Sequence, residues 1–128
     1  MDQVDQPHAE LPRRKRILDR CISNFNLYAS EMAALESRVR HLDAFPIHLR
    51  PDTYATDRAF FVRRGRDLVM YMHVLVDVAA RLVPGHWDSP PIVLMNPMLD
   101  WLPSEKTQMD NLFHDWKRAL LDEYVRSL

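Results

Sequence analysis

The sequence predicts an all-α protein, a helical bundle built from three main helices. From position 18 to position 42, apolar residues fill the first and fourth positions of a seven-residue repeat, over four repeats without exception. Only 2 of the 128 residues are glycine, which suits helices. No stretch alternates apolar and polar residues as a half-buried strand would. Together these observations favour helices packed on helices.

The first predicted helix runs from about residue 12 to residue 43. Pro12 is placed to open it, because the missing N–H of a proline costs nothing in the first turn. The repeat forms an apolar seam, which must be covered by another helix of this chain or of a second one. Its first positions are Leu18, Phe25, Met32 and Val39, and its fourth positions are Cys21, Tyr28, Leu35 and Leu42. The only cysteine is therefore expected to be a buried apolar side chain rather than a reactive thiol.

The second predicted helix covers about residues 56–83. Two prolines within 44–54 mark that segment as an irregular connection, and Thr56 is placed as the N-cap. Gly65 interrupts the helix, but the apolar face continues in phase past it, so one continuous helix with a buried Gly65 is expected. This face consists of Phe61, Leu68, Met72, Leu75, Ala79 and Leu82.

Residues 84–103 are rich in proline and large apolar side chains. A short helix is predicted near 97–102, and the third main helix covers about 104–127, capped by Ser104. An apolar connection of this kind either packs across the bundle or offers a docking surface. In the second case, the expected partner-binding anchors are Trp87, Met95, Met98, Leu99 and Trp101.

Residues 1–10 are polar and acidic and are predicted to be a flexible tail, before a single helical domain over 11–128. This start has no apolar segment typical of a signal peptide, and no stretch is long and apolar enough to span a membrane. A cytoplasmic protein without a membrane partner is therefore expected.

The net charge of −1 hides an uneven distribution. Residues 11–66 carry 12 Lys or Arg against 6 Asp or Glu, whereas residues 67–128 carry 5 against 9. The two parts could attract each other within one bundle, or the basic part could contact nucleic acid or an acidic protein. The candidate anion-contacting residues are Arg13, Arg14, Lys15, Arg16, Arg20, Arg63, Arg64 and Arg66.

One face of the second helix is polar, and it either meets solvent or lines a cleft. Within this face, Arg66 and Asp67 followed by His73 resemble the motif of HEPN-type ribonucleases, which are all-α domains of similar size that act as dimers. The resemblance covers 8 residues. It implies that Arg66 and His73 polarise a phosphate and provide acid or base for attack by a ribose 2′-hydroxyl.

Other site chemistry has little support in the sequence. Two pairs of potential ligands, His73 with Asp77 and Asp110 with His114, would need their helices to face each other to hold a metal. No cysteine cluster, His-x-x-x-His pair or glycine-rich phosphate loop accompanies them, so neither metal nor cofactor is expected.

The leading expectation is that this protein is a non-enzymatic α-helical interaction module or a small subunit of a larger assembly. It would either self-associate or bind a partner protein. Two alternatives stay open. One is a nucleic-acid-contacting subunit that uses the basic face of the first two helices. The other is an HEPN-like ribonuclease.

Overall fold

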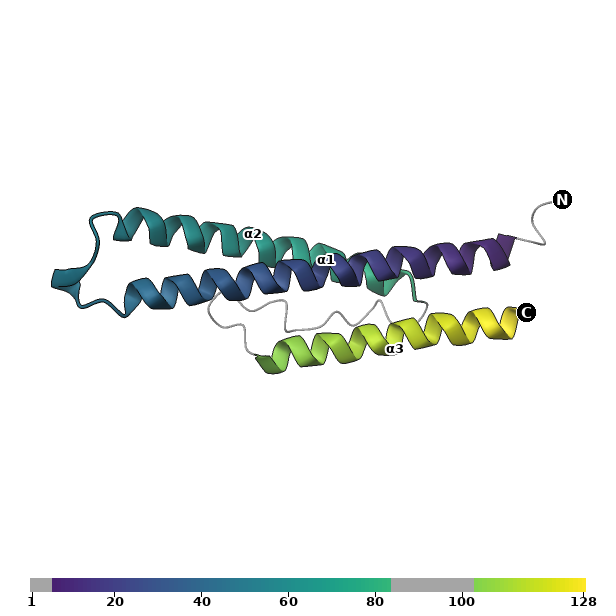
Figure 1. Cartoon of the computed structure of the whole chain (residues 1–128). Helices are drawn as coiled ribbons and strands as arrows, with labels where there is room; N and C mark the ends of the chain where they lie inside the picture. The colour runs from purple at the N-terminus through teal and green to yellow at the C-terminus, as the bar shows by residue number, and fades with distance from the viewer. Residues whose placement is uncertain (1–5, 84–102) are drawn as a thin grey trace.

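The computed structural model describes residues 6–83 and 103–128, and within them it contains three long helices and no strand (Figure 1). In chain order these are α1 (Gln6–Asp43), the 3₁₀ turn η2 (Ile47–Leu49), α2 (Tyr54–Arg81) and α3 (Pro103–Ser127). The predicted all-α bundle is confirmed. The short helix predicted near 97–102 lies outside the described residues.

Helix α1 is the central element, because both other helices pack against it. All the predicted seam residues are buried except Tyr28, which is half-buried. The seam is widened by Ala29 and Glu36, which are also buried and lie at the fifth position of the repeat. A stripe of this width has room for two neighbouring helices, which is why one seam can organise the whole bundle.

The start of α1 differs from the prediction. The helix begins at Gln6, so residues 6–10, predicted to belong to a flexible tail, form its first turns. Pro12 lies inside the helix instead of opening it, which removes one backbone hydrogen bond. Leu11 stands seven residues before Leu18, and it is buried in the same core. The burial of Leu11 offsets the loss of the backbone hydrogen bond at Pro12. It also extends the seam by one repeat.

Helix α2 runs antiparallel to α1 along much of its length (Figure 1). It begins two residues before the predicted start, so Thr56 lies within the helix and Thr53 takes the N-terminal flanking position. The helix continues through Gly65, which is buried as predicted. The absence of a side chain there lets α1 and α2 approach closely.

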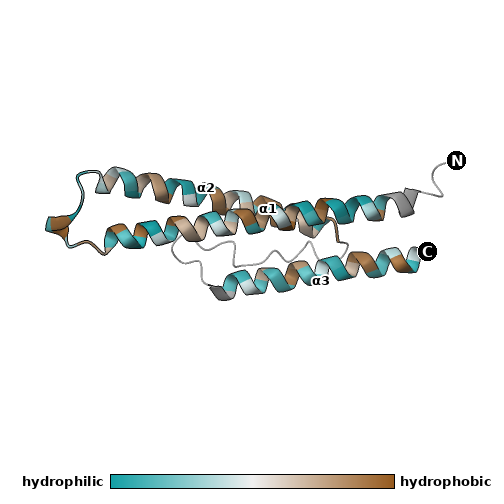
Figure 2. Cartoon of the chain, in the orientation of Figure 1, coloured by the Kyte–Doolittle hydropathy of each residue, from teal (hydrophilic) through white to brown (hydrophobic). Residues whose placement is uncertain are grey.

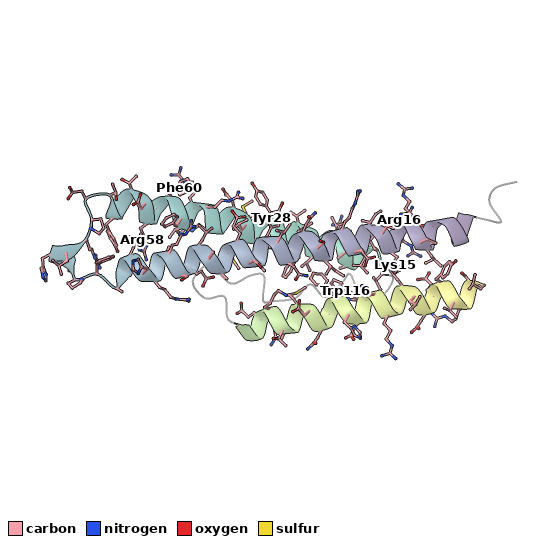
Figure 3. All side chains as sticks on the ribbon, in the orientation of Figure 1. Lys15, Arg16, Tyr28, Arg58, Phe60 and Trp116 are labelled. Carbon is pink, nitrogen blue, oxygen red and sulfur yellow. The ribbon has the colours of Figure 1, made fainter. Side chains whose placement is uncertain are left out.

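Helix α3 lies along α1 from near the N-terminal end of α1 to beyond its middle, and it is antiparallel to α1 (Figure 1). Phe113 of α3 packs edge-on against Phe25 of α1, with ring centroids 5.0 Å apart, and against Trp116 at 5.8 Å. All three side chains are buried. Trp116 is turned towards α1 in Figure 3. These aromatic rings are the centre of the contact between α1 and α3.

A cluster of polar contacts holds the connection between α1 and α2. Asp43, the last residue of α1, accepts hydrogen bonds from the Tyr54 hydroxyl at 2.6 Å and from Nε of Arg58 at 2.8 Å. Arg50 lies over the Tyr54 ring, 4.3 Å from its centroid. Hydrogen bonds from Arg58 and Tyr54 lower the pKa of Asp43 from 3.8 to about 2.

Replacing Phe25 by alanine tests the central position of α1. Because this fully buried ring contacts α3 from the seam, we expect Phe25→Ala to lower the free energy of unfolding by about 3–5 kcal/mol. The control is Leu27→Ala, two residues away and exposed, for which a change below about 0.5 kcal/mol is expected. Urea unfolding followed by circular dichroism measures both. Similar losses for the two variants would contradict the packing.

The Asp43 cluster predicts a pH dependence of stability. Because the folded-state pKa of Asp43 lies below its ordinary value, its contribution is present above about pH 4 and is lost as the pH falls towards about 2. Asp43 is more than a third exposed, so the contribution should stay below about 1 kcal/mol. We expect Asp43→Asn to flatten the fall in unfolding free energy over this range. Asp52→Asn, at an exposed position of the same connection, should follow the wild type. An equal fall in wild type and Asp43→Asn would refute this assignment.

Candidate functional site

The structure divides the predicted basic cluster of α1 into paired and exposed side chains. Arg14 is largely buried, and its Nη1 donates to the Leu82 carbonyl oxygen at 3.0 Å while Nη2 donates to Glu123 at 3.2 Å. Lys15 forms an ion pair with Asp19 at 3.0 Å. Neither side chain is therefore free to contact an anion.

The other three residues of this cluster form an exposed group, called here the arginine rim. It consists of Arg13, Arg16 and Arg20. In the described part of the chain none of the three has an ion pair or hydrogen bond assigned to its side chain. Together with Ile17 they line a hollow of about 370 Å³. The rim is therefore the part of the α1 cluster that is available to a ligand.

The basic cluster of α2 also consists of paired and exposed side chains, and it lies at a distance from the cluster of α1. Arg64 donates to both carboxylate oxygens of Glu31 on α1, at 3.0 and 3.3 Å, and this pairing raises the pKa of the guanidinium. Arg63 and Arg66 are exposed. Because Arg64 lies beside Glu31, this cluster is about 16 Å or more along α1 from Arg20. The two clusters do not form one continuous basic patch.

Arg66 and His73 lie on the same side of α2, two turns apart, as the helical spacing requires. Arg66 is exposed, and His73 is half-buried. The Nδ1 atom of His73 is buried and has no hydrogen-bond partner among the described residues. This arrangement satisfies the spacing of the ribonuclease motif, but no other described side chain is hydrogen-bonded into it.

The other predicted sites are the partner-binding anchors, the metal ligands and the cysteine. The partner-binding anchors Trp87, Met95, Met98, Leu99 and Trp101 lie outside the described residues. Within the described ranges, no group of three or more His, Cys, Asp or Glu could hold a metal ion. No helix in those ranges is long and apolar enough to cross a bilayer. Cys21 is buried, and burial raises the pKa of its thiol.

The structure also shows an exposed apolar stripe on α2, which was not predicted from the sequence. It consists of Met70, Tyr71, Val74 and Val78, whose exposed fractions are 66, 45, 58 and 39%. In Figure 2, the C-terminal half of α2 includes strongly hydrophobic stretches. The opposite side of this helix, with Leu68, Met72 and Ala79, is buried in the core as predicted. Helix α2 thus carries more apolar surface than α1 and α3 cover.

A second apolar surface lies where the start of α1 meets the end of α3. A pocket of about 210 Å³ is lined there by Leu11, Pro12, Lys15, Leu120, Leu121 and Tyr124. Leu121, Val125 and Leu128 are exposed near it. Lys15 is the basic side chain that lines this pocket, and it is already paired with Asp19.

Arg14 provides a test of which basic residues are structural. Because Arg14 joins α1 to the end of α2 and to α3, we expect Arg14→Ala to lower the free energy of unfolding by about 1–3 kcal/mol. Arg14→Lys should not restore it, since the single nitrogen of an ammonium group does not reach two separate acceptors as the two Nη atoms of the guanidinium do. Arg13→Ala, one residue away on the exposed rim, is the control and should change it by less than about 0.5 kcal/mol. Thermal unfolding of the three variants measures this, and equal effects at the two positions would contradict it.

Comparisons of the chain with protein-family models, with curated proteins and with solved structures found no match. A function for this protein therefore has to be argued from the surface that its helices present. Two features stand out on that surface, the apolar stripe of α2 and the arginine rim of α1.

Proposed function

We propose that this protein is a non-enzymatic helical interaction module, and that the apolar stripe of α2 is its contact surface for a partner protein. One observation carries the proposal. Four apolar residues, Met70, Tyr71, Val74 and Val78, lie together on one side of a well-packed helix and remain substantially exposed. Contiguous exposed apolar surface of this kind is typical of protein-interaction sites.

The composition of the stripe supports a protein partner. Tyrosine and methionine are enriched at the centre of protein interfaces, where an aromatic ring or a flexible thioether fills a partner's surface. The half-buried Tyr28 of α1 contacts Tyr71, with ring centroids 5.8 Å apart. This contact holds one end of the stripe in place before a partner arrives, which reduces the entropy lost on binding.

The apolar segment over 84–102 remains a second predicted contact region. Its proposed anchors, Trp87, Met95, Met98, Leu99 and Trp101, are residue types that dominate the energetics of interfaces.

The two alternatives make different demands. A nucleic-acid-contacting subunit would depend on the arginine rim and would not need the apolar stripe. A ribonuclease of the HEPN type would depend on Arg66 and His73 and would cleave RNA. Neither alternative gives a role to the exposed apolar side chains of Tyr71, Val74 and Val78, and this favours the interaction module.

A single substitution in the stripe tests the proposal. Val74 of α2 and Val125 of α3 are both 58% exposed, so Val74→Glu and Val125→Glu add the same charge at equally exposed positions of two different helices. Each tagged variant is used to isolate associated proteins from the native cell extract, with quantification by mass spectrometry. We expect Val74→Glu to reduce recovery of the specific partner by at least about tenfold and Val125→Glu to leave it nearly unchanged.

His73→Ala and the triple variant Arg13→Gln, Arg16→Gln, Arg20→Gln extend this experiment to the alternatives. Loss of recovered RNA in the triple variant, with Val74→Glu behaving as wild type, would favour nucleic-acid contact instead. RNA cleavage that disappears in His73→Ala would favour the ribonuclease. Identical recovery of proteins with Val74→Glu and wild type would contradict the proposed contact surface.

A further inference from the structure

We infer that the partner segment bound by this surface is an acidic amphipathic helix, an inference that rests on the interaction function proposed above. The binding surface consists of the arginine rim of α1 and the apolar stripe of α2. A ligand of this surface would place carboxylates against the rim and aliphatic side chains against the stripe, which specifies the chemistry of the partner proposed above.

The contacts between α1 and α2 place the rim and the stripe at the same level of the bundle. Near one end, Arg14 bonds to the Leu82 carbonyl oxygen at 3.0 Å. Towards the middle, Tyr28 contacts Tyr71. Because the helices are antiparallel, residues 71–82 of α2 lie alongside residues 14–28 of α1. This stretch contains the stripe and the rim except for Met70 and Arg13, each of which lies one residue outside it.

The same contacts place them on the same side of the bundle. Arg64, Tyr71 and Val78 are spaced by seven residues, so they share one edge of α2. Arg64 pairs with Glu31, and Tyr71 contacts Tyr28, so this edge of α2 borders α1.

On α1, a single face with spacings of three and four residues contains positions 13, 17, 20, 24, 28 and 31. By continuation of these contacts, Val78 borders α1 near Ile17 and Arg20.

This side of the bundle is not covered by α3. Lys15 and Asp19 lie on the part of α1 that faces α3, since Lys117 reaches Asp19 at 3.4 Å and Lys15 lines the pocket against Leu120. Figure 3 shows Arg16 on the opposite side of α1, pointing away from α3. Among the described elements, no helix packs over the rim.

The charges on this surface call for a negatively charged ligand. The three rim guanidinium groups are exposed around a hollow of about 370 Å³ that includes Ile17. Two of the nearby carboxylates are engaged elsewhere, because Glu31 pairs with Arg64 and Asp19 pairs with Lys15 and Lys117. A third, Asp77, lies at the edge of the stripe away from Tyr71 and from α1, one turn before Arg81. Asp67 lies at the far end of the stripe, where it interacts with Arg64. Guanidinium groups bind carboxylates well, since their geometry allows two parallel hydrogen bonds.

A helix matches the shape of this surface. The rim extends over Arg13–Arg20 and the main part of the stripe over Tyr71–Val78, so each covers about 10 Å of its helix, or two turns. An amphipathic helix laid beside α1 and α2 would offer aliphatic residues to the stripe at intervals of three and four, and acidic residues to the rim from its flank. A nucleic-acid backbone would engage the rim and leave Val74 and Val78 in water.

The test uses a synthetic peptide of about 16 residues with leucine along one helical face and glutamate along one flank of that face. A second peptide replaces every glutamate by lysine. Fluorescence anisotropy measures binding of each peptide to wild type, to Val74→Glu and to the triple variant Arg13→Gln, Arg16→Gln, Arg20→Gln. The matched controls on α3 are Val125→Glu and the double variant Arg118→Gln, Arg126→Gln. Circular dichroism verifies that every variant keeps its helical content.

We expect the glutamate peptide to bind wild type at least about tenfold more tightly than the lysine peptide. Val74→Glu and the triple variant should each weaken this binding at least about tenfold, whereas the α3 controls should stay within about twofold. Equal binding of the two peptides, or binding that is insensitive to either test variant, would overturn the inference.

Three further measurements exclude other occupants and separate this inference from the proposed function. Tighter binding of a single-stranded RNA oligonucleotide or of phosphatidylserine vesicles, unaffected by Val74→Glu, would overturn it. A dimer in light scattering that is lost in Val74→Glu, without peptide binding, would assign the surface to a second copy of this chain. In that last case the acidic partner would be refuted, while the interaction function of the stripe would stand.

Discussion

The burial of the apolar seam of α1 is the constraint on which the rest of the structure depends. Leu18, Phe25 and Met32 are completely buried, and both α2 and α3 obtain their own core by packing against this seam. The two outer helices run in the same direction, antiparallel to α1, and reach different sides of it (Figure 1). Since each outer helix depends mainly on α1, disruption of the seam should release both.

This arrangement also explains why apolar surface remains exposed. A central helix can be covered on two sides by two neighbours, but each neighbour is covered by the central helix on one side only. Helix α2 is apolar over more of its circumference than α1 buries, so the stripe through Met70 and Val74 is left at the surface. The paired basic residues fix the arrangement, since Arg14 connects all three helices and Arg64 connects α1 to α2. The exposed arginines of the rim then add positive charge to the surface of α1.

The sequence was sufficient to predict the seam, the three long helices and the continuation of α2 through Gly65, because heptad spacing and helical phase are local properties. It did not predict that α1 would begin before Pro12. The burial of Leu11, which offsets the backbone hydrogen bond lost at the proline, depends on contacts with distant residues. The ion pairs that Arg14 and Arg64 each form with another helix were not predictable either, because they depend on the register between helices. The apolar stripe was missed for a related reason. A helix that is apolar around most of its circumference does not reveal which part its neighbours cover. Tyr71, Val74 and Val78, which lie between the polar face of α2 and its predicted buried face, were nevertheless a usable signal.

The most direct test of the central claim, that the stripe of α2 is the surface at which a partner binds, is site-specific photocrosslinking. A benzophenone amino acid is placed at position 74 or at position 125, which are equally exposed in the free protein, and the protein is irradiated in its native cell extract. If the stripe is the contact surface, a discrete crosslinked protein should form from position 74 and not from position 125. Crosslinks of equal yield from both positions, or from position 125 alone, would contradict the claim.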